Sequence, residues 1–233
     1  MIGGRETTPG YRAWVLFILV VVYTFNFIDR QIVGILAVPI KADLNLSDTQ
    51  LSLMGGLAFA LFYTFLGVPI AVVADRKSRV WIMSIALAIW SAMTALCGVA
   101  QNFTQLFLAR LGVGVGEAGG VAPAYSLIAD YFPSEKRGRA LSIYSFGIPI
   151  GSALGILLGG VLTSYLDWRS AFIIVGLAGL LLAPVLRLTV RDPDRGGYDA
   201  GPPLTPAPIV EVARRISRKK SFWSVSLEAA ASS

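Results

Sequence analysis

Six long apolar stretches separated by short polar turns dominate the pattern of this chain. Most of them approach or exceed the roughly 20 residues that a helix needs to cross the hydrocarbon core of a membrane. The last stretch is shorter and needs flanking residues to span. We predict six transmembrane helices, at Ala13–Ile40, Leu51–Ala74, Val80–Ala100, Leu106–Ala129, Ala140–Leu166 and Ser170–Leu186.

The six stretches divide into two sets of three. In each set the first stretch carries charges, and a tight turn with an Asp–Arg element joins the other two, at 75–79 and at 167–169. Because the two sets begin on opposite sides of the membrane, they have the pattern of an inverted repeat, which places a substrate site near the midplane. The predicted fold class is an all-α membrane protein of two inverted three-helix repeats.

Composition and charge agree with a membrane protein. Of 233 residues 55% are hydrophobic and 15% charged, and the mean hydropathy is +0.67. The net charge of +6 does not indicate nucleic acid, because basic turns alternate with nearly neutral ones. By the positive-inside rule both termini are cytoplasmic, and the turns near 41–50, 101–105 and 165–169 lie outside. We expect a multi-pass protein of a bacterial plasma (inner) membrane.

The composition changes after Leu186. We therefore divide the chain into a cytoplasmic N-terminus, a six-helix domain, a cytoplasmic linker and the truncated start of a seventh span. Their boundaries are 1–12, 13–190, 191–220 and 221–233. The spacing at Ile209–Ser217 predicts a short amphipathic helix within the linker.

Four charged residues interrupt the apolar stretches: Asp29, Arg30, Arg110 and Glu117. A charge at bilayer depth costs about 2.5–3.5 kcal/mol on insertion scales, so it is kept where it is paired or functional. Arg110 and Glu117 are seven apart and share a helix face, about 10 Å apart along the axis. An ion pair that only holds helices together is the structural alternative.

Asp29 and Arg30 point about 100° apart on a helix, so each needs a partner elsewhere. The two arginines would attract an anionic substrate group. The two carboxylates are the available proton carriers, because the chain has no histidine. A carboxylate whose arginine moves away binds a proton. We predict that Asp29 and Glu117 exchange a proton as a contact between Arg110 and Glu117 forms and breaks.

Two further motifs have structural and functional interpretations. Asp75, Arg76 and Arg79 form a basic turn that either reflects topology alone or acts as a gating latch. Glycines recur every fourth residue in the fifth stretch, which favours close helix packing. They are Gly147, Gly151, Gly155 and Gly159.

Enzymatic chemistry has little support. The chain lacks histidine, H-E-x-x-H and G-x-S-x-G, and its single cysteine, Cys97, has no partner for a disulfide. The usual nucleophile and metal constellations are therefore missing, and we expect no metal, no cofactor and no enzyme. An intramembrane dyad of Asp29 and Glu117 is the remaining enzymatic alternative, and it is disfavoured.

Several segments carry a family resemblance. The turn AVVADRKSRV resembles the loop between spans 2 and 3 of the major facilitator superfamily, although it departs at Ala71, Ser78 and Val80. Four longer segments resemble its Spinster-like branch, over about residues 12–190. They are NFIDRQ, ADLNLSDTQLSLMGG, ARLGVGVGEAGGVAPAYSLIADYFP and RGRALSIYSFGIPIGSALG.

The resemblance implies an alternating-access, proton-coupled carrier of lipid-like or amphipathic anions. The four intramembrane charges would line its central cavity, with Asn26, Arg30 and Arg110 binding substrate and Asp29 and Glu117 coupling protons. Symporters of sugar acids and similar organic anions share the N-x-x-D-R and G-E-A elements and are the nearest alternative.

Such carriers have twelve spans, and this chain supplies six. We therefore expect a second six-helix half as partner, beside membrane lipids, substrate and protons. A non-transporting half or an assembly module is the alternative from another class.

Overall fold

The computed structural model of the chain describes residues 7–54, 67, 69–196 and 217–219, which contain helices and turns but no strand. The chain divides into two compact units, 1–201 and 202–233, and only 217–219 of the second are described. Among the described residues, the first unit contains the helices α1 (Pro9–Leu44), α2 (Asp48–Ser52), α4 (Arg79–Cys97), α5 (Phe103–Glu117), α6 (Val121–Tyr131), α7 (Ser134–Ser145), α8 (Gly147–Tyr165) and α9 (Trp168–Thr189), and residues 69–74 are also helical.

Local sequence explains where α1 begins and ends. Pro9 occupies the first turn, where its missing N–H costs nothing, and the Thr8 hydroxyl accepts a hydrogen bond from the Tyr11 N–H at 3.3 Å. Asn45 ends the helix in the left-handed conformation, with φ of 51°. The helix therefore extends beyond both ends of the predicted Ala13–Ile40.

Four helical segments of the described chain are long and apolar enough to cross a membrane. Pro9–Leu44, Arg79–Cys97, Ser134–Leu162 and Trp168–Thr189 correspond to the first, third, fifth and sixth predicted stretches. The second predicted stretch lies largely outside the described residues, as do the predicted start of a seventh span and, apart from Ser217, the linker helix at Ile209–Ser217.

The fourth predicted stretch, Leu106–Ala129, is not one continuous helix. It is broken into α5 and α6, with Ala118, Gly119 and Gly120 between them. The turn supplies its own backbone partners, because Gly119 N–H donates to Gly116 and Gly120 N–H to Glu117, both at 3.0 Å. The hydropathy pattern does not reveal the break, because glycine and alanine read as apolar in either conformation.

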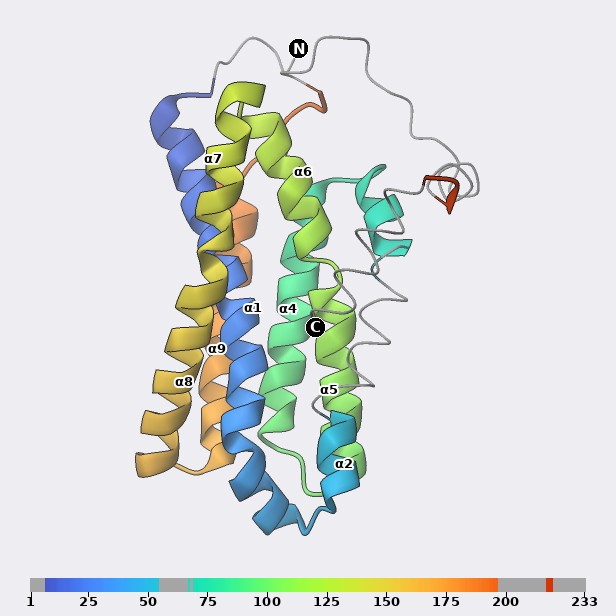
Figure 1. Cartoon of the computed structure of the whole chain (residues 1–233), viewed down its shortest axis with the longest axis vertical. Helices are drawn as coiled ribbons and strands as arrows, with labels where there is room; N and C mark the ends of the chain where they lie inside the picture. The colour runs from blue at the N-terminus through green and yellow to red at the C-terminus, as the bar shows by residue number, and fades with distance from the viewer. Residues whose placement is uncertain (1–6, 55–66, 68, 197–216, 220–233) are drawn as a thin grey trace. The chain divides into compact units, whose positions relative to one another are not determined.

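Glycine stripes bring α8 close to α1, and the two helices run side by side in Figure 1. A Cβ at Gly151 would lie 2.5 Å from the Thr24 carbonyl oxygen and 2.6 Å from the Phe27 Cβ. The three other glycines of the predicted stripe also face α1, where a Cβ would lie 2.7–3.0 Å from its nearest atoms. This helix pair depends on the absence of side chains along one face of α8.

Two apolar clusters fill the inside of the bundle. On α1 the first cluster ends at Val22 and the second begins at Ile28. Buried Thr24 and Asn26 lie between the clusters. Large apolar side chains such as Leu181 and Leu188 are exposed on the outside, as expected of helices that face lipid.

Candidate functional site

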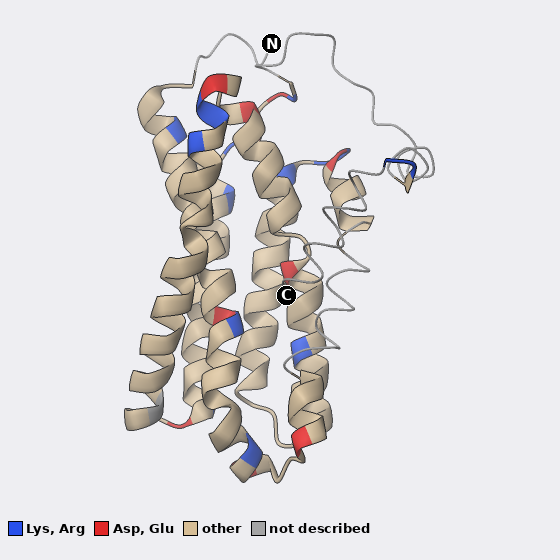
Figure 2. Cartoon of the chain, in the orientation of Figure 1, with Lys and Arg blue, Asp and Glu red and all other residues tan. Residues whose placement is uncertain are grey.

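Two ion pairs join α1 to α5, and we call their four residues the mid-bundle centre. The Arg30 guanidinium contacts Glu117 Oε2 through Nε and Nη2, each at 2.9 Å. Arg110 Nη1 lies 3.6 Å from Asp29 Oδ1. The structure thus brings all four predicted intramembrane charges together. Figure 2 shows most charged residues near the ends of the helices and a smaller group along their middle.

Spacing did not predict these two ion pairs, which join α5 to α1. The contact that we predicted between Arg110 and Glu117 within α5 stays a prediction. Spacing on one helix fixes which residues share a face. It does not fix the register of the neighbouring helix, and that register decides the partners.

The four residues differ in their access to the surroundings. Glu117 is 0% exposed, Asp29 2% and Arg110 5%. The Arg30 side chain is 32% exposed, and its guanidinium lies 5.4 Å from the centre of the Phe27 ring. Arg30 is therefore the most exposed of the four residues.

Three buried oxygens at this level have no hydrogen-bond partner among the described residues: Asn26 Oδ1, Asp29 Oδ1 and Glu117 Oε1. Asn26 is only 3% exposed, so this predicted substrate residue does not line an open surface. Buried oxygens without partners are costly, and most folded proteins avoid them. The centre therefore has spare capacity to accept a proton or a hydrogen-bond donor.

Glu117 lies at the break between α5 and α6. The sequence allows α5 to approach α4 here, because a Cβ at Gly116 would lie 2.6 Å from the Trp90 nitrogen. Broken helices at membrane depth are tolerated where protein covers the backbone, and transporters place ion and substrate sites at such breaks.

A second group of charges, the Arg79 cluster, joins α4, α6 and the segment after α9. Arg79 forms ion pairs with Asp130 and with Asp192, the latter at 2.8 Å. Its guanidinium also donates to Ser126 Oγ at 3.0 Å and to the Pro193 carbonyl at 2.7 Å. Of the predicted gating residues, Arg79 is buried in this cluster, whereas Asp75 and Arg76 are exposed.

The opposite end of the bundle, where α1 ends, has its own charged contact. Arg169 pairs with Asp43 of α1, stacks at 4.3 Å over the Trp168 ring and donates to the Ala100 carbonyl at 3.0 Å. Asp167 caps α9, because its Oδ1 accepts from the Ser170 N–H at 2.8 Å. The two predicted Asp–Arg turns therefore make different contacts.

The sequence interpretation missed several residues of these sites. One is Thr94 of α4, whose Oγ1 donates to Asp29 Oδ2 at 2.5 Å, because a threonine in an apolar stretch gives no signal of its own. Another is Asp130, which lies in the segment LIADYFP and was singled out only by the family resemblance. Asp192 belongs to RDPDR, whose composition predicted a linker, yet residues 191–193 pack against the bundle.

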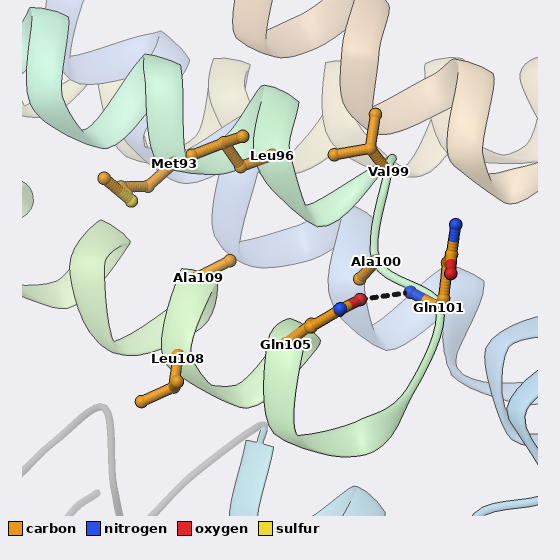
Figure 3. A pocket seen from close by; sticks show the side chains of 8 residues that line it. All are labelled: Met93, Leu96, Val99, Ala100, Gln101, Gln105, Leu108 and Ala109. Carbon is orange, nitrogen blue, oxygen red and sulfur yellow. Dashed lines mark hydrogen bonds between the residues drawn. The ribbon is translucent and has the colours of Figure 1, made fainter.

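A groove of about 450 Å³ lies between the end of α4 and the start of α5 (Figure 3). Met93, Leu96, Val99 and Leu108 give it an apolar wall, and its polar end holds Gln101, whose N–H donates to the Gln105 side chain at 2.8 Å. None of the four mid-bundle charges lines this groove. It is a separate feature from the centre.

Comparison with known proteins gives a consistent result. The family model described as Major Facilitator Superfamily matches residues 19–233. The chain is 37% identical to an "MFS-type efflux pump" of Mycolicibacterium smegmatis, over 91% of this chain and 49% of that protein. It is 32% identical to "Protein spinster homolog 1" of Homo sapiens, over 92% of this chain and 42% of that protein.

Among solved structures, the chain resembles a bacterial homolog to the human lysosomal transporter Spinster, in an inward-facing and unoccupied conformation. The TM-score is 0.82 at 40% identity, and the match covers 97% of this chain and 53% of that one. The chain therefore spans about half the length of the proteins it matches.

Proposed function

The chain belongs to the Major Facilitator Superfamily, to its Spinster-like branch, and we propose that it forms one half of a proton-coupled, alternating-access carrier of amphipathic organic anions. The matched proteins are described as an efflux pump and as transporters, so the expectation that the chain is not an enzyme agrees with its family. The substrate and the coupling ion are part of the proposal.

We assign six spans in two inverted repeats to this half. α1, the predicted 51–74 stretch and α4 form the first repeat, and the broken pair α5–α6, the continuous pair α7–α8 and α9 form the second. The four apolar helices and the likeness to a Spinster-type structure support this arrangement. Both termini would lie in the cytoplasm, and the membrane would be a bacterial inner membrane.

The Arg30–Glu117 pair is the observation that carries the proposal. A wholly buried carboxylate with one spare oxygen is held by an arginine that is about one-third exposed. An anionic head group that binds Arg30 competes with Glu117 for the same guanidinium. Once released, Glu117 is a buried carboxylate without its cation, and such a group favours the protonated form.

The remaining predicted residues take supporting roles. Arg110 and Asp29 form the deeper pair, which would exchange a proton or contact substrate only after the first pair opens. Asn26 would turn its spare oxygen to a donor of the substrate. Asp75, Arg76 and Arg79 would act as a gating latch, in which the buried Arg79 cluster holds the turn in place and the exposed Asp75 and Arg76 make the contacts that change.

The substrate chemistry follows from the charges and the resemblance. The two arginines at bilayer depth are each paired with a carboxylate, so a negative head group would bind where it displaces that carboxylate from the guanidinium. A lipid-like tail is what the family resemblance of the sequence implies. A compact organic anion, such as a sugar acid, is the alternative within the superfamily.

Carriers of this superfamily close a cavity between two six-helix halves. Because the chain spans about half of its relatives, we propose that a second six-helix half completes the cavity. An assembly module without transport is the competing function. The oligomeric state of the purified chain in detergent separates the two, since a monomer without flux favours the module and an assembly with flux favours the carrier.

Replacement of Glu117 tests the coupling role. Uptake of a fluorescently labelled fatty acid into proteoliposomes would be measured with and without an imposed pH gradient. We expect Glu117→Gln to lose the gradient-driven accumulation and to retain exchange of the probe at equal pH, because a neutral amide cannot carry a proton. Glu135→Gln, an exposed carboxylate of α7, is the control and should behave like the unmodified protein. Gradient-driven accumulation that survives Glu117→Gln would remove this residue from coupling.

A further inference from the structure

We infer that Thr94 is a positioning residue that orients the Asp29 carboxylate toward Arg110 and favours its ionised form. This inference rests on the proposed role of Asp29 as a proton carrier. Through this contact Thr94 of α4 would help to set the pH at which the mid-bundle centre takes up a proton.

The contact is short and fully enclosed. Thr94 Oγ1 of α4 donates to Asp29 Oδ2 of α1 at 2.5 Å. Thr94 is 1% exposed and Asp29 2%. The hydroxyl is therefore part of the enclosed surroundings of the carboxylate in this structure.

The hydroxyl divides the two oxygens of Asp29 between two helices. Oδ2 faces Thr94 of α4, which leaves Oδ1 to Arg110 of α5 at 3.6 Å. The other titratable groups that act on Asp29 are Arg30 of α1, Glu117 of α5 and the buried thiol of Cys97 on α4. Unlike these groups, Thr94 carries no charge and does not titrate, and it acts on the carboxylate through a direct hydrogen bond.

Four other helical hydroxyls of the described chain have a partner within their own helix. Ser84, Ser142, Ser164 and Thr189 each donate to the carbonyl four residues earlier in their own helix, at 2.7–3.0 Å. That is the ordinary partner of serine and threonine within helices. Thr94 instead donates across to another helix, so its orientation is selected by Asp29.

The donor acts on the protonation equilibrium in one direction. A hydroxyl that donates to a carboxylate stabilises the ionised form, and a hydrogen bond to a charged group contributes about 1.5–3 kcal/mol. Its loss favours protonation of Asp29 at higher pH, by roughly one to two pH units. Arg110 would also lose the fixed orientation of its partner.

Infrared spectroscopy measures this equilibrium without any transport. The C=O stretching band of the protonated carboxyl is followed against pH in the purified chain, and its loss in Asp29→Asn assigns it to Asp29. We expect Thr94→Val, which keeps the shape and removes the donor, to move the midpoint of this band upward by about one to two pH units. Thr94→Ser should restore the midpoint, because it returns the hydroxyl.

Ser91→Ala is the matched control. Ser91 lies one turn earlier on the same helix, is 2% exposed and has an Oγ without a hydrogen-bond partner among the described residues. Its hydroxyl is as buried as that of Thr94, so its removal should leave the midpoint unchanged. If Thr94→Val does not fold, Thr94→Ala removes the same donor with a smaller side chain.

The outcomes separate this inference from the proposed function. An unchanged midpoint in Thr94→Val and Thr94→Ala, an equal shift in Ser91→Ala, or no titrating Asp29 band at all overturns the inference. A shifted band with an unchanged pH profile of uptake retains the positioning role of Thr94 and instead removes Asp29 from coupling.

Discussion

Arginine meets carboxylate at two enclosed places in the described bundle, in the Arg79 cluster and in the mid-bundle centre. In the Arg79 cluster all three guanidinium nitrogens donate, to oxygens of two carboxylates, one hydroxyl and two backbone carbonyls. In the mid-bundle centre each carboxylate retains one oxygen without a hydrogen-bond partner among the described residues. The carboxylate oxygens all have hydrogen-bond partners in the Arg79 cluster, whereas some lack them in the mid-bundle centre.

The difference indicates what each site is built for. A buried polar network in which every member is satisfied is rigid and holds its elements in one arrangement. A network with spare acceptors is costly in that arrangement, and binding a proton or a donor lowers the cost. We therefore interpret the Arg79 cluster as a structural contact that stabilises the bundle, and the mid-bundle centre as the site that would change its protonation state.

Removal of Arg79 is expected to have the largest effect on stability. Arg79→Ala leaves Asp130 and Asp192 without their cation, and breaking a buried ion pair costs about 3–5 kcal/mol. The free energy of unfolding of the purified chain in detergent measures the loss. Arg76→Ala, in the same turn but exposed, is the control and should stay within about 0.5 kcal/mol. Equal, small losses of unfolding free energy in both variants would contradict the interpretation of the Arg79 cluster as a stabilising structural contact.

Sequence reasoning located the mid-bundle centre but not its pairing. Hydropathy alone identified Asp29, Arg30, Arg110 and Glu117, because a charge stands out in an apolar stretch. The ion-pair partners of these residues depend on how α1 is placed against α5. The sequence of neither helix alone determines the register between them. Asp192 was missed for the opposite reason, because its polar surroundings conceal a tertiary contact.

The helix boundaries show a similar division. Thr8, Pro9 and Asp167 are local capping signals, and α1 and α9 begin where they stand. The break at Ala118–Gly120 depends instead on the close approach of α5 to α4, which glycines permit but do not require. Local chemistry is therefore readable from the sequence, whereas contacts between helices need the structure.

The position of α1, which carries Asp29 and Arg30, depends on its packing against α8. Gly151→Leu should lower the free energy of unfolding by about 1–3 kcal/mol, because a side chain there meets Thr24 and Phe27 of α1. Gly160→Leu on the same helix is the control, since a Cβ there has no atom within 4 Å. Denaturation of both variants in detergent gives the two values. Equal tolerance of leucine at both positions would show that α1 is not fixed by this contact.

Substitution of Asp167, the exposed carboxylate that caps α9, is expected to have the smallest effect on stability. Hydrogen bonds from Ser170 lower the pKa of the Asp167 carboxyl below its ordinary 3.8. A lowered pKa in the folded state means that the ionised cap stabilises α9 above the ordinary pKa, and that this stability is lost as the pH falls through the lowered value. The thermal midpoint of Asp167→Ala should therefore lie slightly below that of the unmodified chain at neutral pH, and the gap should narrow in acid. Asp167→Asn, which can still cap a helix but does not titrate, should show no such narrowing relative to Asp167→Ala. A gap that is constant from neutral to acid pH would mean that the charge of Asp167 contributes nothing, and that only its capping oxygen matters.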